Sequence, residues 1–360
     1  MKILVLANND VGLYQFRREL LGALIAQGHQ VLISLPDGDL VPALQDMGCE
    51  FLDTPIDRRG INPMTDFKLL LHYRAMIRKE KPDLVLCYTI KPNVYGGMVC
   101  RFLKVPYAIN ITGLGTAFQG SGLLRKLVTF LYKTALKKAK TIFFENRSNL
   151  QLFLDEGIAQ ASQCKLLGGA GVNLEHYQVS DYPDDPTIRF LFIGRVMTEK
   201  GIRELFAAMD RLTREGAACT LDVLGYCEED LNAEIEKHTA AGWLRYHGQQ
   251  PDVRPFIRAS HCFVLPSYHE GMANTNLECA ASGRPIITSN IPGCMEAVVD
   301  GASGLLCQSK NEDSLYAAMK QFISLPYEKR AAMGIAGRKH MEENFDKKII
   351  VAQTLKGLDL

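Results

Sequence analysis

The stretch VLPSYHEGMANTNLECAASG, from Val264 to Gly283, decides how the rest of the chain is interpreted. It begins as the end of an apolar strand and passes through a loop of proline and small polar residues. It then becomes a run of helix formers from Asn274 to Ala281, with an asparagine that can cap the helix. This order directs unpaired backbone N–H groups and the positive end of a helix dipole towards one place, which suits a phosphate group.

Two carboxylates bracket this predicted phosphate site. Glu270 lies in the loop before the predicted helix and Glu278 lies inside the helix, with seven residues between them. One of them can therefore contact a sugar and the other a ribose, on either side of a diphosphate.

The pattern of Glu270, seven residues and Glu278, followed by Ala281, Gly283 and Pro285, resembles the nucleotide-sugar signature of the retaining glycosyltransferases of family 4. This resemblance implies an α/β chain with the GT-B fold, in which two Rossmann-like domains face each other across a cleft. It also implies transfer of a hexose or N-acetylhexosamine from a nucleotide-diphosphate sugar, with UDP as the expected nucleotide. The expected acceptor is a glycan, lipid-linked in the assembly of bacterial surface polysaccharides or glycoprotein glycans.

The resemblance covers nearly the whole chain and is strongest over residues 190–305, although Ala273 stands where the family often has proline. We expect an N-terminal acceptor-binding domain over residues 1–178 and a nucleotide-sugar-binding domain over residues 187–344. In GT-B proteins the last helix crosses back onto the first domain, and we expect residues 345–360 to do so here.

Composition agrees with an ordinary globular chain of two domains: 360 residues, 47% hydrophobic and 22% charged. The ten cysteines form no C-x-x-C pair and show no metal-ligand spacing, and free thiols fit a reducing compartment. The first apolar run, Ile3–Ala7, is too short for a signal peptide or a spanning helix, so we expect a cytoplasmic protein. A formal net charge of +1 argues against nucleic acid as a partner.

Two cations follow the strand predicted at residues 189–193. Arg195 and Lys200 lie between the end of this strand and the start of the next helix. The planar guanidinium fork and the mobile ammonium group both suit phosphate. In the resembled family this run supplies two cations to the donor diphosphate, and Glu270 holds sugar hydroxyls. We therefore expect Arg195, Lys200 and Glu270 to be the catalytic residues.

The resemblance implies further donor contacts at neighbouring strand ends. Val253 would offer backbone groups to the base, and Glu278 would hold the ribose. The expected donor-binding residues are Gly194, Val253, Gly271, Met272, Ala273, Asn274, Thr275 and Glu278. Because the two cations and backbone amides can stabilise the leaving diphosphate, we expect no metal and no cofactor.

The first half repeats strand, loop and helix in the order typical of a parallel sheet, whose ligands bind at the carboxyl ends of strands. We expect a loop over Asn8–Gly12 and a helix from Arg17. In the loop after a further predicted strand many relatives place a histidine, where this chain has Ile90. The neighbouring Lys91 is therefore a candidate for contacting an acceptor or donor phosphate, and a solvated lysine is the alternative. The residues expected on the acceptor or phosphate side are Asn9, Gly12, Lys91, Gly113 and Gly115.

Residues 123–140 contain six basic residues and no acidic one, in a first half of net charge +6. On a helix the lysines share one stripe and the apolar residues lie roughly opposite. The lysines are Lys126, Lys133, Lys137 and Lys140, and the apolar residues are Leu124, Leu127, Leu131 and Ala135. One interpretation is a core helix that buries the leucines and exposes the lysines. The other is a helix at the membrane surface that attracts anionic lipid or a lipid diphosphate, as the basic helices of similar lipid-linked glycan enzymes do.

Two other functional classes stay open at this point. An epimerase or hydrolase of nucleotide sugars with the same architecture would need acid–base carboxylates and a histidine at the cleft, and no clear histidine is present there. A sensor or scaffold without catalysis is the other alternative, and the complete set of Arg195, Lys200, Glu270 and Glu278 argues against it.

Overall fold

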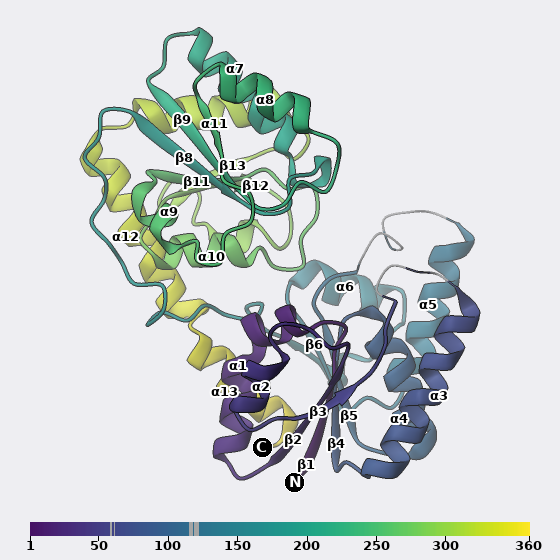
Figure 1. The fold of residues 1–360 in the computed structure, drawn as a ribbon. Coiled ribbons are helices and arrows are strands. Elements are labelled where there is room, and N and C mark those ends of the chain that lie inside the picture. Colours follow the sequence, from purple (N-terminus) through teal and green to yellow (C-terminus); the bar gives the residue numbers. More distant parts are fainter. Residues whose placement is uncertain (58–59, 61, 115–117, 119–121) are drawn as a thin grey trace. The chain divides into compact units, whose positions relative to one another are not determined.

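The computed structural model describes residues 1–57, 60, 62–114, 118 and 122–360, except for the Leu123 side chain. The chain divides into two compact units, which Figure 1 shows with their helices and strands labelled. Unit 1 comprises Met1–Ala170 and Lys348–Leu360, and unit 2 comprises Gly171–Lys347. Residues 171–178, which we had assigned to the first domain, therefore belong to unit 2.

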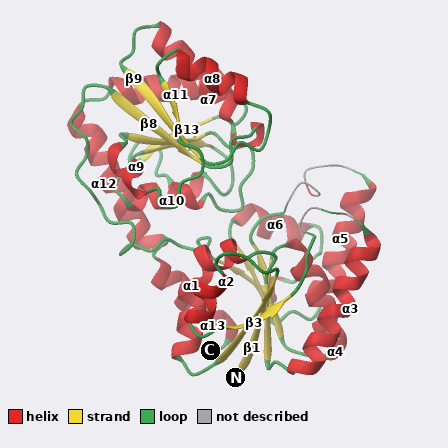
Figure 2. Ribbon diagram, in the orientation of Figure 1, coloured by secondary structure: helices red, strands yellow, loops and turns green. Residues whose placement is uncertain are grey.

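Unit 1 is built on a parallel sheet in the strand order β3-β2-β1-β4-β5-β6-β7. Helices lie on both faces of this sheet (Figure 2). The strands are β1 Lys2–Leu6, β2 Gln30–Leu35, β3 Glu50–Asp53, β4 Leu84–Tyr88, β5 Tyr107–Ile111, β6 Thr141–Phe144 and β7 Cys164–Leu166. The helices are α1 Asp10–Ala26, α2 Val41–Asp46, α3 Pro63–Glu80, α4 Gly97–Leu103, α5 Leu123–Leu136 and α6 Arg147–Asp155.

Unit 2 has a parallel sheet in the order β10-β9-β8-β11-β12-β13. Its strands are β8 Ile188–Ile193, β9 Cys219–Leu224, β10 Leu244–Tyr246, β11 Cys262–Leu265, β12 Ile286–Ser289 and β13 Gly304–Cys307. Its helices are α7 Ile202–Arg214, α8 Asn232–Ala240, α9 Arg254–Ala259, α10 Asn274–Ala281, α11 Glu312–Ser324 and α12 Tyr327–Asn344.

Both sheets are doubly wound, and the direction of winding reverses between β1 and β4 in unit 1 and between β8 and β11 in unit 2. Ligands of such sheets bind beyond the carboxyl ends of the strands at the point of reversal. The central strands are continuous apolar runs because both faces of each sheet are covered by helices. Phe190, Phe192 and Phe263 in these strands are fully buried.

The last helix, α13 Lys347–Leu358, packs on unit 1, as the GT-B resemblance implied. Thr141 Oγ1 at the start of β6 donates a hydrogen bond to the carbonyl of Gly357 (2.7 Å), and Lys140 Nζ donates to that of Leu358 (2.8 Å). The side chains of Ile350 and Leu358 join the apolar core on one face of the sheet. The predicted α/β architecture with a returning C-terminal helix is confirmed.

Three local predictions were wrong. The predicted loop Asn8–Gly12 ends early, because α1 begins at Asp10 rather than at Arg17 and the Asn9 side chain caps it by accepting a hydrogen bond from the Gly12 N–H (2.6 Å). Asn274 does not cap α10 either, since Ala273 occupies the N-cap position. The basic helix ends at Leu136 rather than near Lys140.

Candidate functional site

Two loops of unit 2 meet at the reversal point of its sheet. Strands β8 and β11 are parallel neighbours, so the loop after Ile193 and the loop after Leu265 leave the same edge side by side. The first loop carries Arg195 and Lys200, and the second carries Glu270. The two predicted cations and the predicted sugar-binding carboxylate are thus brought together by sheet topology, across some 70 residues of sequence.

The two loops pack against each other through their backbones. The N–H of Tyr268 donates to the carbonyl of Glu199 (2.9 Å). Gly201 has a φ of +71°, and a Cβ there would lie 2.1 Å from the carbonyl oxygen of Pro266. Only glycine satisfies both the left-handed backbone and this approach, so Gly201 sets the spacing between the loops.

Lys200 and Glu270 form an ion pair between the loops, with 18% and 12% of their side chains exposed. Ser267 Oγ also donates to Oε1 of Glu270 (2.8 Å), which gives the carboxylate a second anchor in its own loop. The structure identifies Glu270 as the partner of Lys200.

Arg195 is paired with a residue that the sequence analysis did not name. Its Nη1 lies 2.5 Å from Oε2 of Glu228, in the loop that follows β9. The neighbouring Glu229 accepts two hydrogen bonds from Thr198, from the N–H (3.0 Å) and from Oγ1 (2.6 Å). A pair of glutamates three residues beyond a predicted strand end, as in GYCEED, was the available signal, because β9 neighbours β8.

The N-terminus of α10 faces this region without a side-chain cap. Its first N–H groups have no intrahelical partner and suit an anion. Gly293 allows its own loop to pack closely against the backbone of the Glu270 loop. Its φ is +87°, and a Cβ at this position would lie 2.7 Å from the Glu270 carbonyl oxygen. The Oδ1 atom of Asn274, at the first position of the helix, is buried with no hydrogen-bond partner in the structure. Met272 and Ala273 are buried, and Thr275 is half-buried.

Glu278 lies one turn further along α10 and interacts with Tyr177, from the segment that enters unit 2. Burial raises the pKa of Glu278 from its usual value of 4.5 to about 7, and the Tyr177 hydroxyl and the charge of Lys347 oppose that shift only in part. The predicted ribose-binding carboxylate therefore titrates near neutral pH, which its sequence position did not indicate.

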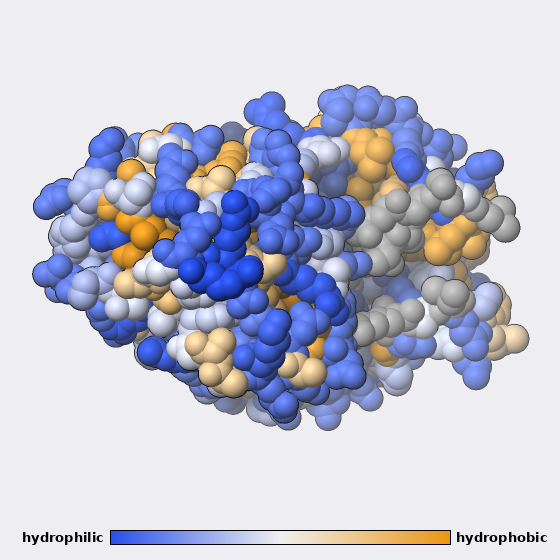
Figure 3. Space-filling model, turned by 90° about the horizontal axis from the view of Figure 1, so that it is seen from above, coloured by the Kyte–Doolittle hydropathy of each residue, from blue (hydrophilic) through white to orange (hydrophobic). Residues whose placement is uncertain are grey.

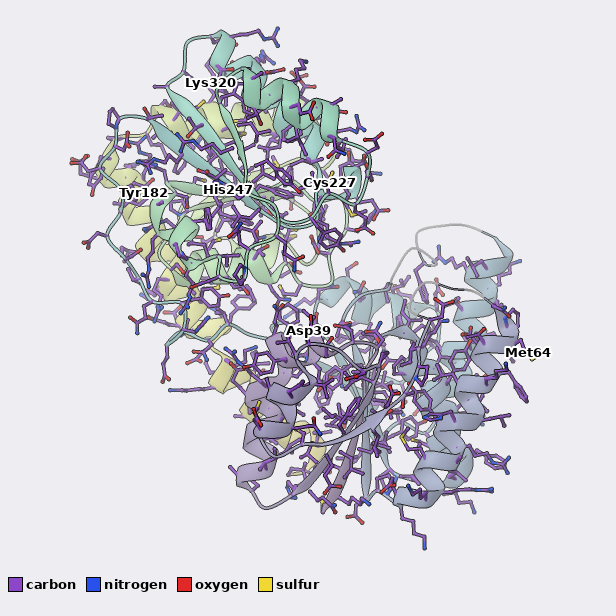
Figure 4. The ribbon with its side chains drawn as sticks, in the orientation of Figure 1. Asp39, Met64, Tyr182, Cys227, His247 and Lys320 are labelled. Carbon is purple, nitrogen blue, oxygen red and sulfur yellow. The ribbon has the colours of Figure 1, made fainter. Side chains whose placement is uncertain are left out.

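Val253 is the N-cap residue of α9, which begins at the predicted turn after β10. In the same loop His247 lies 2.6 Å from Oδ1 of Asp222, which belongs to β9, and its ring contacts Phe256 at a centroid distance of 4.7 Å. Figure 4 labels His247 and Cys227, which follow β10 and β9 in unit 2. The His247–Asp222 pair was missed because its members come from different strands.

In unit 1 the predicted residues have local partners. Asn9 and Gly12 are engaged with each other at the cap of α1. Lys91 Nζ lies 2.7 Å from Oδ1 of Asp66 in α3. Gly113 directly follows β5 with a φ of +156°, and Gly115 lies outside the described residues. The structure thus gives Asn9 and Gly12 a helix-capping role that the sequence did not reveal.

A backbone distortion follows β4. Thr89 has a φ of +72°, which is rare for a β-branched residue, and its Oγ1 is buried with no hydrogen-bond partner in the structure. Such strain persists only where the surrounding structure enforces it, and it is frequent at functional sites. Thr89 immediately precedes the Ile90–Lys91 segment and marks this strand end as unusual.

Helix α5 buries only part of the apolar stripe that the core-helix interpretation placed inside, since Ala135 is fully buried and Leu131 is half-buried. Leu124 and Leu127 are 51% and 52% exposed, and Phe130 is 64% exposed. The helix instead packs through Tyr132, Ala135 and Leu136, which are fully buried. No helix in the described parts of the chain is long and apolar enough to span a membrane.

Two family models match the chain. Residues 178–340 match glycosyl transferases group 1, and residues 2–146 match glycosyl transferase 4-like. Among curated relatives, an N,N'-diacetylbacillosaminyl-diphospho-undecaprenol alpha-1,3-N-acetylgalactosaminyltransferase of Campylobacter jejuni is 25% identical, covering 100% of this chain and 98% of that protein. A UDP-Gal:alpha-D-GlcNAc-diphosphoundecaprenol alpha-1,3-galactosyltransferase of Escherichia coli is 25% identical, covering 80% and 78%.

Among solved structures, Anabaena Alr3699/HepE in complex with UDP and glucose has a TM-score of 0.81 at 18% identity, covering 100% of this chain and 99% of that one. A sucrose-phosphate synthase of Thermosynechococcus elongatus has a TM-score of 0.81 at 20% identity, covering 99% and 98%. These likenesses show that the complete two-unit fold is shared.

Proposed function

This chain belongs to the group 1 glycosyltransferases with the GT-B fold, and from that premise we propose which sugar transfer it performs. It moves a hexose or N-acetylhexosamine from a UDP-sugar to a lipid-linked glycan, with retention of the anomeric configuration and without a metal. The reaction would serve the assembly of bacterial surface polysaccharide or glycoprotein glycans. Unit 2 binds the donor, and unit 1 supplies the acceptor side.

One observation carries this proposal: Arg195, Lys200 and the uncapped N-terminus of α10 converge at the reversal point of the sheet in unit 2. Sugar transfer releases a nucleoside diphosphate, and the negative charge that develops on it is the main target for catalysis. Two cations and free N–H groups placed beforehand stabilise that charge with little reorganisation. Removing one such group typically costs about 10²–10³ in kcat.

The carboxylates divide the rest of the donor between them. Glu270, held by Ser267, accepts hydrogen bonds from sugar hydroxyls when Lys200 turns to the diphosphate. Glu278 accepts hydrogen bonds from the ribose, and backbone groups at Val253 contact the base. The acceptor then attacks from the face that the diphosphate leaves, through an oxocarbenium-like state.

The relatives support the choice of substrates. The relatives from C. jejuni and E. coli are named for sugars on diphospho-undecaprenol, and the Anabaena structure holds UDP. These names favour transfer to a lipid-linked acceptor over the epimerase, hydrolase and sensor alternatives.

The first test is a panel of thermal shifts with UDP, GDP, ADP and dTDP, each with and without EDTA. We expect UDP alone to stabilise the protein, by about 2.7 kcal/mol at 100 times its dissociation constant, and EDTA to leave the shift unchanged. A shift that EDTA abolishes would contradict metal independence. No shift with any nucleotide would contradict the donor site itself.

We further propose that unit 1 associates peripherally with an anionic membrane through α5 and its neighbours α3 and α4. Helix α4 contacts both α3 and α5. Together they expose a row of large apolar side chains, and Figure 3 shows orange residues beside the grey atoms of the undescribed segments. The exposed apolar residues are Met64, Phe67 and Leu71 of α3, Phe102 of α4, and Leu124, Leu127 and Phe130 of α5.

Charge complements this apolar surface. Residues 123–140 hold six basic residues and no acidic one, so the lysines beside the apolar row can meet anionic headgroups. A cavity of about 490 Å³ opens between the three helices, lined by Leu70, Arg74, Met98, Phe102 and Thr134. Met64 projects outward from the start of α3 (Figure 4).

Sedimentation with liposomes tests this surface. We expect binding to vesicles that contain phosphatidylglycerol and little binding to pure phosphatidylcholine. Replacing Leu127 and Phe130 together by Gln should weaken binding about tenfold or more, because each loses most of the transfer free energy of an apolar side chain. Ile335→Gln on α12, at a residue that is 57% exposed, is the matched control. Equal binding of the double variant and the control would rule the surface out.

A further inference from the structure

The loop that follows β9, residues 225–231, runs along the loop that carries the two predicted catalytic cations. Val196 forms an isolated parallel bridge with Cys227. The Val196 N–H donates to the carbonyl of Tyr226 (2.9 Å), and the Glu228 N–H donates to the carbonyl of Val196 (3.1 Å). These hydrogen bonds extend the β8–β9 pairing beyond the strands, so residues 225–231 form a brace for residues 194–201.

Gly225 makes the close approach of the two loops possible. Its φ is +133°, and a Cβ at this position would lie 1.9 Å from the carbonyl oxygen of Gly194. A side chain at Gly225 would therefore push the brace away from Arg195. The glycine places the following glutamates within hydrogen-bonding distance of the cation loop.

The two adjacent glutamates act on different groups. Glu229 binds Thr198 with both carboxylate oxygens, at 3.0 Å to the N–H and 2.6 Å to Oγ1. Thr198 begins the short 3-10 turn Thr198–Lys200, so Glu229 fixes the backbone from which Lys200 projects. Glu228 instead meets the guanidinium group of Arg195 at 2.5 Å.

The Glu228–Arg195 pair differs in kind from the Lys200–Glu270 pair. Glu270 belongs to the proposed sugar contacts and has Ser267 as a second anchor. Glu228 comes from the loop after β9 and is not among the proposed sugar contacts, so its charge competes with any phosphate for the guanidinium of Arg195. The pair is partly exposed, with 39% of the Arg195 side chain and 17% of the Glu228 side chain accessible, so exchanging its anion costs little.

We propose that Glu228 is an internal counter-anion that lowers donor affinity by holding Arg195 until the donor diphosphate replaces it, and that Glu229 is a positioning residue for the cation loop. This inference rests on the proposed function, because it takes Arg195 as a diphosphate ligand. After transfer the exchange is reversed, and Glu228 displaces the product UDP from Arg195. The affinity for UDP is therefore moderate. The brace thus favours release of the nucleoside diphosphate after transfer.

The test compares Glu228→Gln with Glu229→Gln by calorimetric titration of UDP and of uridine, which lacks phosphate. Both substitutions remove one negative charge from the same loop, so a general electrostatic effect would tighten UDP binding in both. We expect opposite signs. Glu228→Gln should lower the UDP dissociation constant about two- to fivefold, and Glu229→Gln should raise it about fivefold. Uridine affinity should change in neither variant.

Asp313→Asn, in the exposed pair with Arg211, is the control and should bind UDP like the original protein. Equal or weaker UDP binding by Glu228→Gln would overturn the counter-anion role. A parallel change in uridine affinity would show that the base site, rather than the phosphate contact, had moved, and would overturn it as well. If the unsubstituted protein bound no UDP, the proposed function would itself fail and this inference with it.

Discussion

The two units share one topology and use their strand ends differently. At the reversal point of unit 2, residues from three loops bind one another: Arg195 pairs with Glu228, Lys200 pairs with Glu270, and Thr198 donates hydrogen bonds to Glu229. At the reversal point of unit 1, Asn9 after β1 caps its own helix, and Asp10 accepts a hydrogen bond from the backbone of Leu40 (2.9 Å). A doubly wound sheet therefore provides the place for a ligand, and the loop residues decide its chemistry.

Unit 1 is distinguished by its backbone and its surface rather than by a cluster of cations. Thr89 is held in a left-handed conformation directly after β4, and Lys91 is paired with Asp66 nearby. The α3–α5 side of the unit exposes apolar side chains instead of burying them. These features suit an acceptor that is attached to a lipid, whereas unit 2 has the charges that suit a nucleoside diphosphate. Three predictions test this contrast.

The largest effect is expected from the donor side. Lys200→Ala should lower kcat about 10²- to 10³-fold, because the diphosphate loses one of its two cations at the moment when its charge develops. Turnover of a UDP-sugar with a lipid-linked acceptor measures the loss, and the thermal midpoint should stay close to the original. Lys320→Ala, which removes an exposed lysine paired with Glu215, is the control. Nearly normal turnover of Lys200→Ala would contradict the catalytic role of Lys200.

A smaller effect is expected from the acceptor side. Lys91→Ala should lower kcat/KM for the acceptor about tenfold and leave the UDP dissociation constant unchanged, since Lys91 belongs to unit 1. Acceptor titrations at saturating donor, together with UDP calorimetry, separate these quantities. Lys68→Ala, at an exposed lysine of α3, is the matched control. An equal loss of UDP affinity would show that Lys91 contributes to donor binding instead.

The smallest effect concerns pH. Glu278 has a pKa raised to about 7 by burial, and the ribose hydroxyls donate to its ionised form. UDP affinity should therefore rise a few-fold from pH 6 to pH 8. In Glu278→Gln the rise should shrink to what the titration of UDP itself contributes, and that contribution is common to both proteins. Calorimetry across this range makes the measurement, and identical pH profiles would contradict the ribose role.

The same shift has a consequence for stability with a definite sign. Because the folded pKa of Glu278 exceeds the usual 4.5, the neutral carboxyl is favoured by the fold. Its contribution to the free energy of unfolding is complete below pH 4.5 and is lost as the pH rises through about 7. Bound UDP should offset this loss, since it interacts with the ionised carboxylate.

Local patterns in the sequence were sufficient to predict most helices and strands and to identify the two loops of the donor site. The predicted run of helix formers from Asn274 to Ala281 coincides with α10, because helix propensity acts over a few residues, although Ala273 rather than Asn274 occupies the N-cap position. The 264–283 stretch and the Gly194–Gly201 run could be assigned to one site because parallel neighbours end at one edge of a sheet. The family matches agree with that assignment of fold.

Only the tertiary structure decided which charges meet and which apolar residues stay exposed. The partner of Arg195 comes from the loop after the neighbouring strand β9, and the glutamates of GYCEED could pair with the cation loop only because β9 lies beside β8. The leucines of α5 follow a helical period that fits burial, yet Leu124 and Leu127 are exposed while Ala135 on the same stripe is fully buried, because the helix packs through its C-terminal half. The raised pKa of Glu278 likewise depends on burial, which comes from folding and outweighs the opposing hydrogen bond from Tyr177. Sequence determines local preference, whereas desolvation and ion pairing depend on what the folded chain brings within a few ångströms.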